Sequence, residues 1–92
     1  MELDSVVCAT NHQVSSRLDD EVAILELDRG VYYGLSRAGA RIWELIQQPT
    51  LVREVQERLV SEYEVDAERC RADLLELLSS LQQAGLVEER RA

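Results

Sequence analysis

The chain has 92 residues, which suits one compact domain, and we expect residues 1–92 to form that single domain. Its 18 acidic residues stand against 10 basic ones, all arginine, and the net charge is −8. This balance disfavours nucleic acid or an anionic membrane as a partner, and it favours a basic or neutral peptide or protein surface.

The first part of the chain carries the strand signals. Residues 5–10 predict a short strand, and residues 14–18 are expected to extend it or to pair with it. Two apolar runs, 22–27 and 31–35, flank Asp28-Arg29-Gly30. A three-residue loop with glycine in the left-handed position is a common hairpin connection, and here it gives one wholly apolar face. The predicted core-facing residues are Ala23, Leu25, Leu27, Val31, Tyr33 and Leu35, and the outward ones are Val22, Ile24, Glu26, Tyr32 and Gly34.

Three helices are expected to follow the strands. Ser36, Thr50 and Asp66 are suitable N-caps, and Gly85 is a suitable stop for the third helix. The charged tail 88–92 is expected to fray. Strands followed by helices predict an α+β domain, with helices on one face of a small antiparallel sheet. The helices are expected at residues 36–47, 51–62 and 67–83.

The residues that carry catalysis and metal binding are scarce. The chain has one histidine, no lysine, no glycine-rich phosphate loop and none of the common hydrolase motifs. Cys8 and Cys70 lie far apart and, with His12, are too few for structural zinc. Cys8 and His12 lack a third group to orient a base. We therefore expect two reduced thiols, no enzyme activity, no metal and no cofactor, although a disulfide between the cysteines stays open.

The amino terminus lacks the basic and apolar regions of a signal peptide. No apolar run approaches the ~20 residues that cross a bilayer. The sequence therefore predicts a cytoplasmic protein with no membrane partner.

The third predicted helix has the place of a DNA-reading helix in a winged helix-turn-helix. Between residues 66 and 83 it carries four acidic and two basic residues, a net charge of −2. Helices that enter a major groove need the opposite balance, because phosphate neutralisation supplies much of their affinity. A winged-helix DNA-binding regulator is therefore the weaker alternative.

Some apolar residues exceed what a one-sided core needs. Leu75 lies roughly 100° from Leu74 around the third helix, and the outward hairpin face carries Val22, Ile24 and Tyr32. Either these residues pack under the amino-terminal strand or a loop, or they line a groove between the second hairpin strand and the third helix. Such a groove beside a free strand edge suits an extended peptide that adds as another strand.

The segment Gly30–Leu45, which reads GVYYGLSRAGARIWEL, resembles the strand-into-helix part of the PqqD-like family. These proteins are the recognition elements of ribosomally synthesised and post-translationally modified peptides (RiPPs). The resemblance continues through residues 52–59 and 62–66 and ends in 73–78 and 81–87. It covers about residues 20–88 and implies a winged helix-turn-helix-like fold, in which a three-stranded antiparallel sheet precedes three helices.

Family members bind the leader of a precursor peptide as an added strand, between their third strand and third helix. Carried over, those elements are residues 31–35 and 67–83. The chain looks most similar to the free-standing members of lasso-peptide pathways. This implies a precursor leader peptide, a leader-removing cysteine protease and an ATP-dependent cyclase as partners. Leaders in that subgroup carry a Tyr-x-x-Pro element, which implies a pocket for an aromatic side chain.

Two departures from the family pattern bear on the subgroup. Gln47-Gln48-Pro49 stands where an Asp-Gly turn is common, and Ser36 stands where the strand often ends in asparagine. The alternative within the family is a PqqD-type peptide chaperone for a radical enzyme.

The expected site joins a strand to a helix. The backbone of residues 31–35 is expected to pair with the leader, with Tyr32 and Gly34 on the floor of the cleft. Leu75 and Leu78 are expected to form an apolar wall with Leu74 behind them, although a core role for Leu74 and Leu78 stays open. Arg71 is expected to pair with an acidic leader residue, and Asp73 or Glu76 with a basic one. The predicted peptide-binding residues are Val31, Tyr32, Tyr33, Gly34, Leu35, Arg71, Leu74, Leu75 and Leu78.

An unpaired strand edge also bears on the oligomeric state of the protein. Because it exposes backbone donors and acceptors, it also permits a homodimer.

Overall fold

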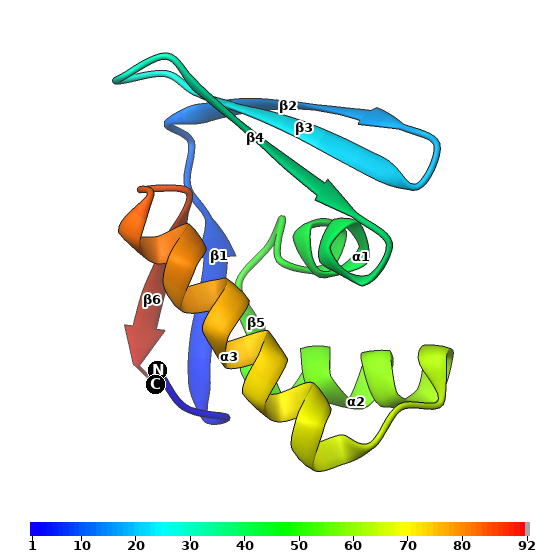
Figure 1. Cartoon of the computed structure of the whole chain (residues 1–92). Coiled ribbons are helices and arrows are strands. Elements are labelled where there is room, and N and C mark those ends of the chain that lie inside the picture. Colours follow the sequence, from blue (N-terminus) through cyan, green and yellow to red (C-terminus); the bar gives the residue numbers. More distant parts are fainter. Residues whose placement is uncertain (92) are drawn as a thin grey trace.

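The chain folds into two small antiparallel sheets and three helices (Figure 1). The computed structural model describes residues 1–91. One sheet has the strand order β2-β3-β4, and the other has the order β5-β1-β6. The elements are β1 Ser5–Ala9, β2 Gln13–Leu18, β3 Glu21–Glu26, β4 Val31–Ser36, α1 Ala38–Leu45, β5 Thr50–Leu51, α2 Val52–Tyr63, α3 Ala67–Gln83 and β6 Val87–Arg91.

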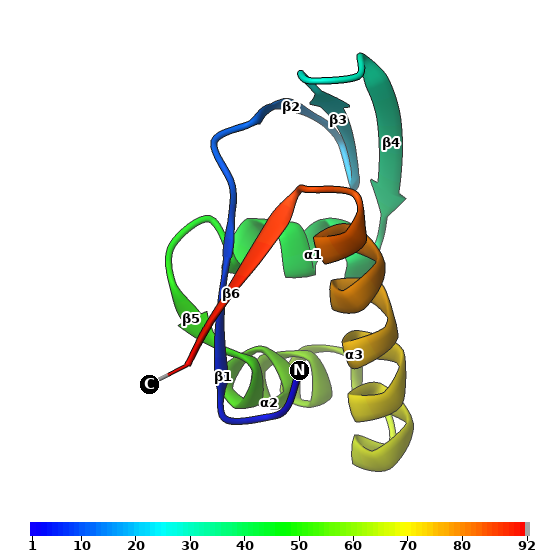
Figure 2. The ribbon, with the colours of Figure 1, turned by 90° about the vertical axis from the view of Figure 1, so that its left-hand side faces the viewer.

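The β2-β3-β4 sheet followed by three helices confirms the predicted fold class. α1 lies directly beneath this sheet, and α2 lies further from it, as both ribbon views show (Figures 1 and 2). The predicted strand at residues 5–10 forms as β1. The expected pairing of residues 14–18 with that strand is wrong, because β2 pairs with β3.

The register of the β3–β4 hairpin differs from the predicted one by one residue. Ile24 pairs with Tyr33 and Val22 with Leu35, so the connecting loop has four residues, 27–30, instead of three. On β4 the inward residues Tyr33 and Leu35 are as predicted, and both are half-buried. On β3 the faces are exchanged, because a slip of one residue turns every side chain over. Val22, Ile24 and Glu26 are buried, whereas Leu27 is exposed.

The reason for this register is the side chain of Glu26. Its carboxylate accepts hydrogen bonds from the backbone N–H groups of Asp28, at 2.7 Å, and Arg29, at 3.0 Å. Burial opposes the ionised form, but these hydrogen bonds and the Arg29 side chain outweigh it and lower the pKa of Glu26. A charged residue therefore occupies the inner face because it closes the turn. The apolar pattern of the sequence does not predict this.

The third helix begins and ends where the sequence predicts. Asp66 is its N-cap, and the Asp66 carboxylate accepts a hydrogen bond from the Arg69 backbone N–H at 3.0 Å. At the other end Gly85 has a φ of 79°, and the Leu86 N–H donates to the Leu81 carbonyl at 2.9 Å. This is a Schellman-type ending, which favours glycine at the left-handed position.

Two other predicted caps are wrong. The residue before α1 is Arg37, with a φ of 53°, and Ser36 still belongs to β4. Thr50 lies in β5, and its hydroxyl donates to the carbonyls of Leu45 and Gln48 instead of capping α2. α2 therefore begins at Val52, and pairing of β5 with β1 sets that start.

The carboxyl-terminal segment is ordered, contrary to the expected frayed tail. β6 pairs with β1 along its length, and Val87 is buried opposite Ala9. The Ser5 hydroxyl donates to the Glu89 carboxylate at 2.6 Å, so one charge of the tail has a partner in β1. Backbone pairing with a buried strand thus outweighs the polar composition of the segment. Ala92, the last residue of the expected tail, lies outside the described residues.

One apolar core connects both sheets and the three helices. Val7 of β1, Ile24 of β3 and Leu78 of α3 belong to it and are fully buried. Cys8 and Cys70 are separate free thiols. Among residues 1–91, no helix combines the length and the apolar character that a membrane span requires.

Candidate functional site

The outer edge of β4 pairs with no strand of the described chain. Both ribbon views place β4 as the strand of its sheet nearest to α3 (Figures 1 and 2). The inner face of this edge is apolar, because the register places Val31, Tyr33 and Leu35 there. β4 therefore offers unpaired backbone groups and apolar side chains next to a helix.

β4, α1 and α3 come together at one point below this edge. A methyl group placed on Gly39 of α1 would lie 3.5 Å from the Leu35 Cβ atom and 3.9 Å from the Leu77 Cδ2 atom. Leu35 of β4 and Leu77 of α3 thus both lie near Gly39 of α1, where a methyl group would fit at ordinary van der Waals distance.

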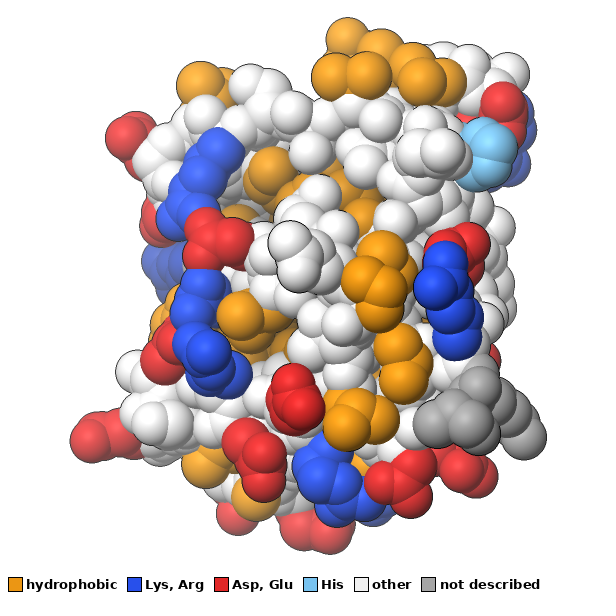
Figure 3. Space-filling view, turned by 180° about the vertical axis from the view of Figure 1, so that it is seen from behind, with side chains coloured by type: hydrophobic (Ala, Val, Ile, Leu, Met, Phe, Trp, Pro, Cys, Tyr) orange, Lys and Arg blue, Asp and Glu red, His pale blue; other side chains and the backbone are white. Residues whose placement is uncertain are grey.

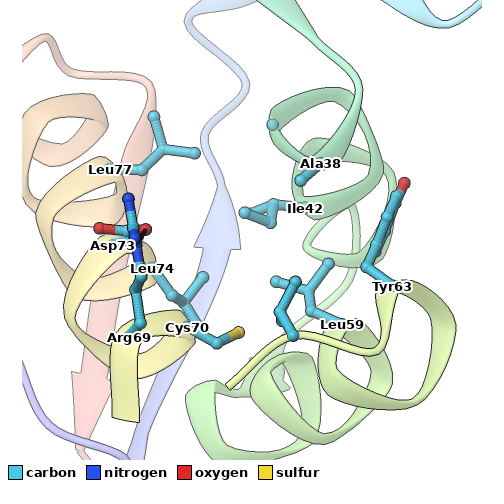
Figure 4. Close-up of a pocket in the computed structure, with 11 residues that line it drawn as sticks. Ala38, Ile42, Leu59, Tyr63, Arg69, Cys70, Asp73, Leu74 and Leu77 are labelled. Carbon is cyan, nitrogen blue, oxygen red and sulfur yellow. Dashed lines mark ion pairs between the residues drawn. The ribbon is translucent and has the colours of Figure 1, made fainter. Parts of the chain in front are cut away.

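A cavity of about 360 Å³ opens from this junction between the three helices (Figure 4). It is near the small end of the range for ligand pockets, so it suits one or two side chains rather than a large cofactor. α1 contributes Ile42, α2 contributes Leu59, and α3 contributes Leu74 and Leu77. The lining residues are Ala38, Gly39, Ile42, Leu59, Tyr63, Val65, Arg69, Cys70, Asp73, Leu74 and Leu77.

Polar groups lie only at the rim of this cavity. Arg69 and Asp73 are exposed, and the Arg69 Nε and Asp73 Oδ2 atoms are 3.8 Å apart. Tyr63, at the end of α2, is 44% exposed, and its ring points up beside α1 on the side of the cavity away from α3 (Figure 4). The cavity thus has an apolar interior, and its rim offers an aromatic ring, a cation and an anion.

Cys70 is the one nucleophile that lines the cavity. Its burial, and then the nearby Asp73 carboxylate, raise the pKa of the thiol. A raised pKa keeps the thiol protonated near neutral pH, and the thiolate is the reactive form. Cys70 therefore contributes apolar surface rather than nucleophilic chemistry.

The predicted β4 residues divide between two faces of the sheet. Tyr33 and Leu35 point inward, toward the helices. Tyr32 and Gly34 lie on the outer face, where Tyr32 is 72% exposed and a methyl group on Gly34 would touch nothing within 4 Å. The side chain of Tyr32 is therefore on the opposite face from the cavity, and its backbone alone belongs to the free edge.

The predicted α3 residues are similarly divided. Leu74 lines the cavity although it is almost fully buried, whereas Leu78 is fully buried in the core. Leu75 lies roughly 160° around the helix from Leu77, and Arg71 about 120°. Neither Leu75 nor Arg71 lines the cavity.

The site predicted from the sequence does not include several of the residues that line the cavity. Leu77 of α3 and Leu59 and Tyr63 of α2 line the cavity but are absent from the predicted peptide-binding residues. Asp73 was expected to meet a basic leader residue, and it does lie at the rim. Of these residues only Leu77 approaches Gly39, and no signal in the sequence separates the three from the buried stripes of their helices.

The fold and site together are a small sheet with a free edge beside a helix-lined cavity. The chain belongs to the PqqD family, described as coenzyme PQQ synthesis protein D, whose pattern matches residues 21–87. No curated protein sequence matches the chain.

Two solved structures share the fold. One is TbiB1 in complex with the TbiA(beta) leader peptide, with a TM-score of 0.83 and 34% identity over 88% of this chain and 94% of that one. The other is lasso peptide synthetase B1 complexed with the leader peptide, with a TM-score of 0.79 and 23% identity over 89% of this chain and 96% of that one. The predicted membership of the PqqD-like family is therefore confirmed.

Proposed function

We propose that residues 1–92 act as one non-catalytic domain that binds the leader of a ribosomally made precursor peptide. The observation that carries this proposal is the unpaired edge of β4 beside the cavity between the helices. An extended leader adds to β4 as a fourth strand, and its main chain pairs with the backbone of residues 31–35. TbiB1, a relative of 34% identity, was solved with a leader peptide bound, which supports leader binding.

Specificity in this proposal comes from the cavity, because main-chain pairing accepts almost any extended peptide. An apolar or aromatic leader side chain enters between Leu77, Leu59 and Ile42. Tyr63, Arg69 and Asp73 at the rim then meet neighbouring polar groups of the leader. A tyrosine of a Tyr-x-x-Pro element suits this arrangement, since its ring is apolar and its hydroxyl needs a polar partner.

The pathway is proposed to be a lasso-peptide pathway, located in the cytoplasm. In it, the protein presents the leader to a leader-removing cysteine protease and an ATP-dependent cyclase. The likeness to lasso peptide synthetase B1 supports this assignment. A second candidate, a peptide chaperone for a radical enzyme, is favoured by the description of the family as coenzyme PQQ synthesis protein D.

Binding to duplex DNA is disfavoured by the charges of α3. Arg69 Nε lies 3.8 Å from Asp73 Oδ2, and Arg71 Nη2 lies 3.9 Å from Glu68 Oε1. Both arginines of this helix therefore have acidic neighbours on the same surface, which offsets their attraction to phosphates.

Calorimetric titration with a synthetic leader tests the proposal. We expect one leader per protein, and we expect a leader with its tyrosine replaced by alanine to bind at least about tenfold more weakly. A scrambled leader of the same composition is the control. Equal affinity for the scrambled peptide would refute leader recognition, and tighter binding of a PQQ precursor peptide would favour the second candidate.

A further inference from the structure

The last turn of α2 contributes to the wall of the cavity, although it is not buried in the core. Tyr63 ends this helix, and Val65 follows it in the connection to α3. Both residues line the cavity, and both are 44% exposed. The last buried residue of α2 is Leu59, one turn earlier. Burial in the core therefore does not hold the turn that carries Tyr63.

A bidentate ion pair connects this turn to α1. The Arg41 Nε and Nη2 groups donate to the two carboxylate oxygens of Glu62, both at 2.9 Å. Among residues 1–91, this pair is the only polar side-chain contact between α1 and α2. A bidentate pair fixes direction as well as distance, because the planar guanidinium must match the planar carboxylate. We call Arg41 and Glu62 the α1–α2 clamp.

The α1–α2 clamp adjoins two residues that line the cavity. Arg41 precedes Ile42 on α1, and Glu62 precedes Tyr63 on α2. Ile42 and Tyr63 line the cavity, whereas Arg41 and Glu62 do not. Figure 4 shows the Tyr63 ring beside α1, on the side away from α3. Loss of the clamp would therefore free the wall that carries Tyr63 and leave every lining side chain unchanged.

Two further charges support the α1–α2 clamp from the sheet. Glu44 binds Arg41 and also Arg17 of β2, so a row of four charges runs from β2 through α1 to α2. Figure 3 shows basic and acidic side chains next to one another along the side of the molecule that carries these helices. The Arg41 and Glu62 side chains are 25% and 35% exposed, against 56% for Arg17. Because water weakens ion pairs, we expect the clamp to be the strongest link of the row.

We propose that Arg41 is a positioning residue for leader specificity; this inference rests on the proposed function. Through Glu62, Arg41 holds the last turn of α2, and with it Tyr63, at the cavity that receives the anchor side chain of the leader. A wall that is already in place spares the free energy of ordering it when the leader binds. The clamp thus favours a leader with an aromatic anchor over one whose anchor is too small to reach the α2 wall.

Titration of clamp variants with two synthetic leaders tests this role. One leader carries the tyrosine anchor, and the other has alanine in its place. We expect Arg41→Gln to weaken binding of the tyrosine leader about fivefold and binding of the alanine leader less than about twofold. The ratio of the two affinities should therefore fall. Glu62→Gln should lower this ratio to the same extent, because it breaks the same ion pair from the other side.

A double variant separates positioning from direct contact with the leader. If Arg41 acts only through Glu62, the variant with both glutamines should bind within about twofold of either single variant. Arg41→Lys keeps the charge but loses the bidentate fork, so its affinity ratio should lie between those of the parent and Arg41→Gln. Arg53→Gln is the matched control. It removes an exposed ion pair with Asp4 at the other end of α2 and should change neither affinity.

Three results would overturn this inference in a parent protein that binds the leader. The first is an unchanged affinity ratio in both single variants, with circular dichroism spectra equal to that of the parent. The second is an equal loss for both leaders together with a lower melting temperature, which would make the clamp a stabilising contact only. The third is additive losses in the double variant, which would place Arg41 in direct contact with the leader. A parent protein that binds no leader would instead refute the proposed function, so the two failures are distinguishable.

Discussion

The β2-β3-β4 sheet has two outer strands, and the residues on their inner faces differ. On β4 these residues are Val31, Tyr33 and Leu35, and on β2 they are Gln13, Ser15 and Arg17. Both strands have one unpaired edge within the described chain. Only β4 combines that edge with apolar side chains and with a helix-lined cavity.

The polar residues of β2 bind α1. The Trp43 Nε1 group donates to the Ser15 hydroxyl at 3.2 Å, and Arg17 forms an ion pair with Glu44. Glu44 also pairs with Arg41, whose guanidinium binds Glu62 of α2 at 2.9 Å. Polar contacts thus hold the inner side of β2 to the helices, and the cavity of about 220 Å³ beside it is lined partly by these polar residues. A free strand edge alone is thus not a peptide site, because an apolar surface beside it must supply the anchor.

The largest effect is expected from charge placed on the cavity side of α3. Leu77→Glu should weaken leader binding by about 30-fold or more, which corresponds to ~2 kcal/mol, because the carboxylate loses water where the anchor enters. Calorimetric titration measures it. Leu75→Glu is the matched control, since Leu75 is also half-buried but lies on the other flank of the helix. If Leu75→Glu abolishes binding and Leu77→Glu does not, the leader lies on that other flank.

A smaller effect is expected from blocked main-chain groups of the leader. N-methylation of single leader residues should reduce affinity about fivefold at every second position of the paired segment and have little effect between them. An added strand directs alternate N–H groups toward β4, and each lost bond of this kind costs about 1 kcal/mol. Competition binding with the methylated series measures the pattern. Losses without a period of two would contradict strand addition.

Protection of Cys70 should report occupancy of the cavity. We expect saturating leader to slow alkylation of Cys70 several-fold, because the anchor covers the cavity that this thiol lines. Its raised pKa should make the reaction slow at neutral pH and faster as the pH rises. Mass spectrometry of each cysteine separates the two sites. Cys8 lies on β1 outside the cavity and serves as the internal control, so equal protection of both thiols would indicate a global change.

The turn that sets the β4 register should depend on pH. Glu26 has a lowered pKa in the folded protein, so its ionised form stabilises the fold above the ordinary carboxyl pKa. That contribution is lost as the pH falls through the lower folded value. Glu26→Gln should therefore be less stable than the parent at pH 7, and the difference should shrink below about pH 4. Urea denaturation at both pH values measures this, and a difference independent of pH would exclude Glu26 ionisation as the cause.

The smallest effect is expected at the β2 edge. Arg17→Ala removes the ion pair with Glu44, which is exposed to solvent, and should cost less than ~1 kcal/mol of folding stability. Leader affinity should stay within about twofold, because β2 is not the receiving strand. Thermal denaturation and titration measure the two quantities. A large loss of leader affinity would show that the two edges do not act separately.

Strong local signals made part of this fold predictable. The bounds of α3 follow from Asp66 and Gly85, which fix the helix ends through contacts with their near neighbours. The hairpin register was missed because Glu26 is buried and hydrogen-bonds the turn, whereas the prediction placed this charged residue on the outer face. β6 was missed because its pairing partner, β1, is more than 70 residues away along the chain.

The candidate site was only partly predictable for a similar reason. Residues 31–35 follow from the apolar pattern of the hairpin and from the family resemblance. The choice between Leu75 and Leu77 does not, because both are half-buried beside the buried stripe of α3 and the periodicity does not say which element each one faces. Leu77 and Leu35 both lie near Gly39 of α1, and helical periodicity does not contain this three-dimensional arrangement.

The pairing of Ser5 with Arg91 brings the beginning and the end of the described chain together. Figure 1 shows both at the opposite end of the molecule from β4. A unit built this way can be inserted into a loop of a larger enzyme, since its two connections leave from adjacent strands. Tethering it there would raise the local concentration of captured substrate without obstructing the receiving edge. The same architecture thus permits both a free-standing carrier and a covalently fused one.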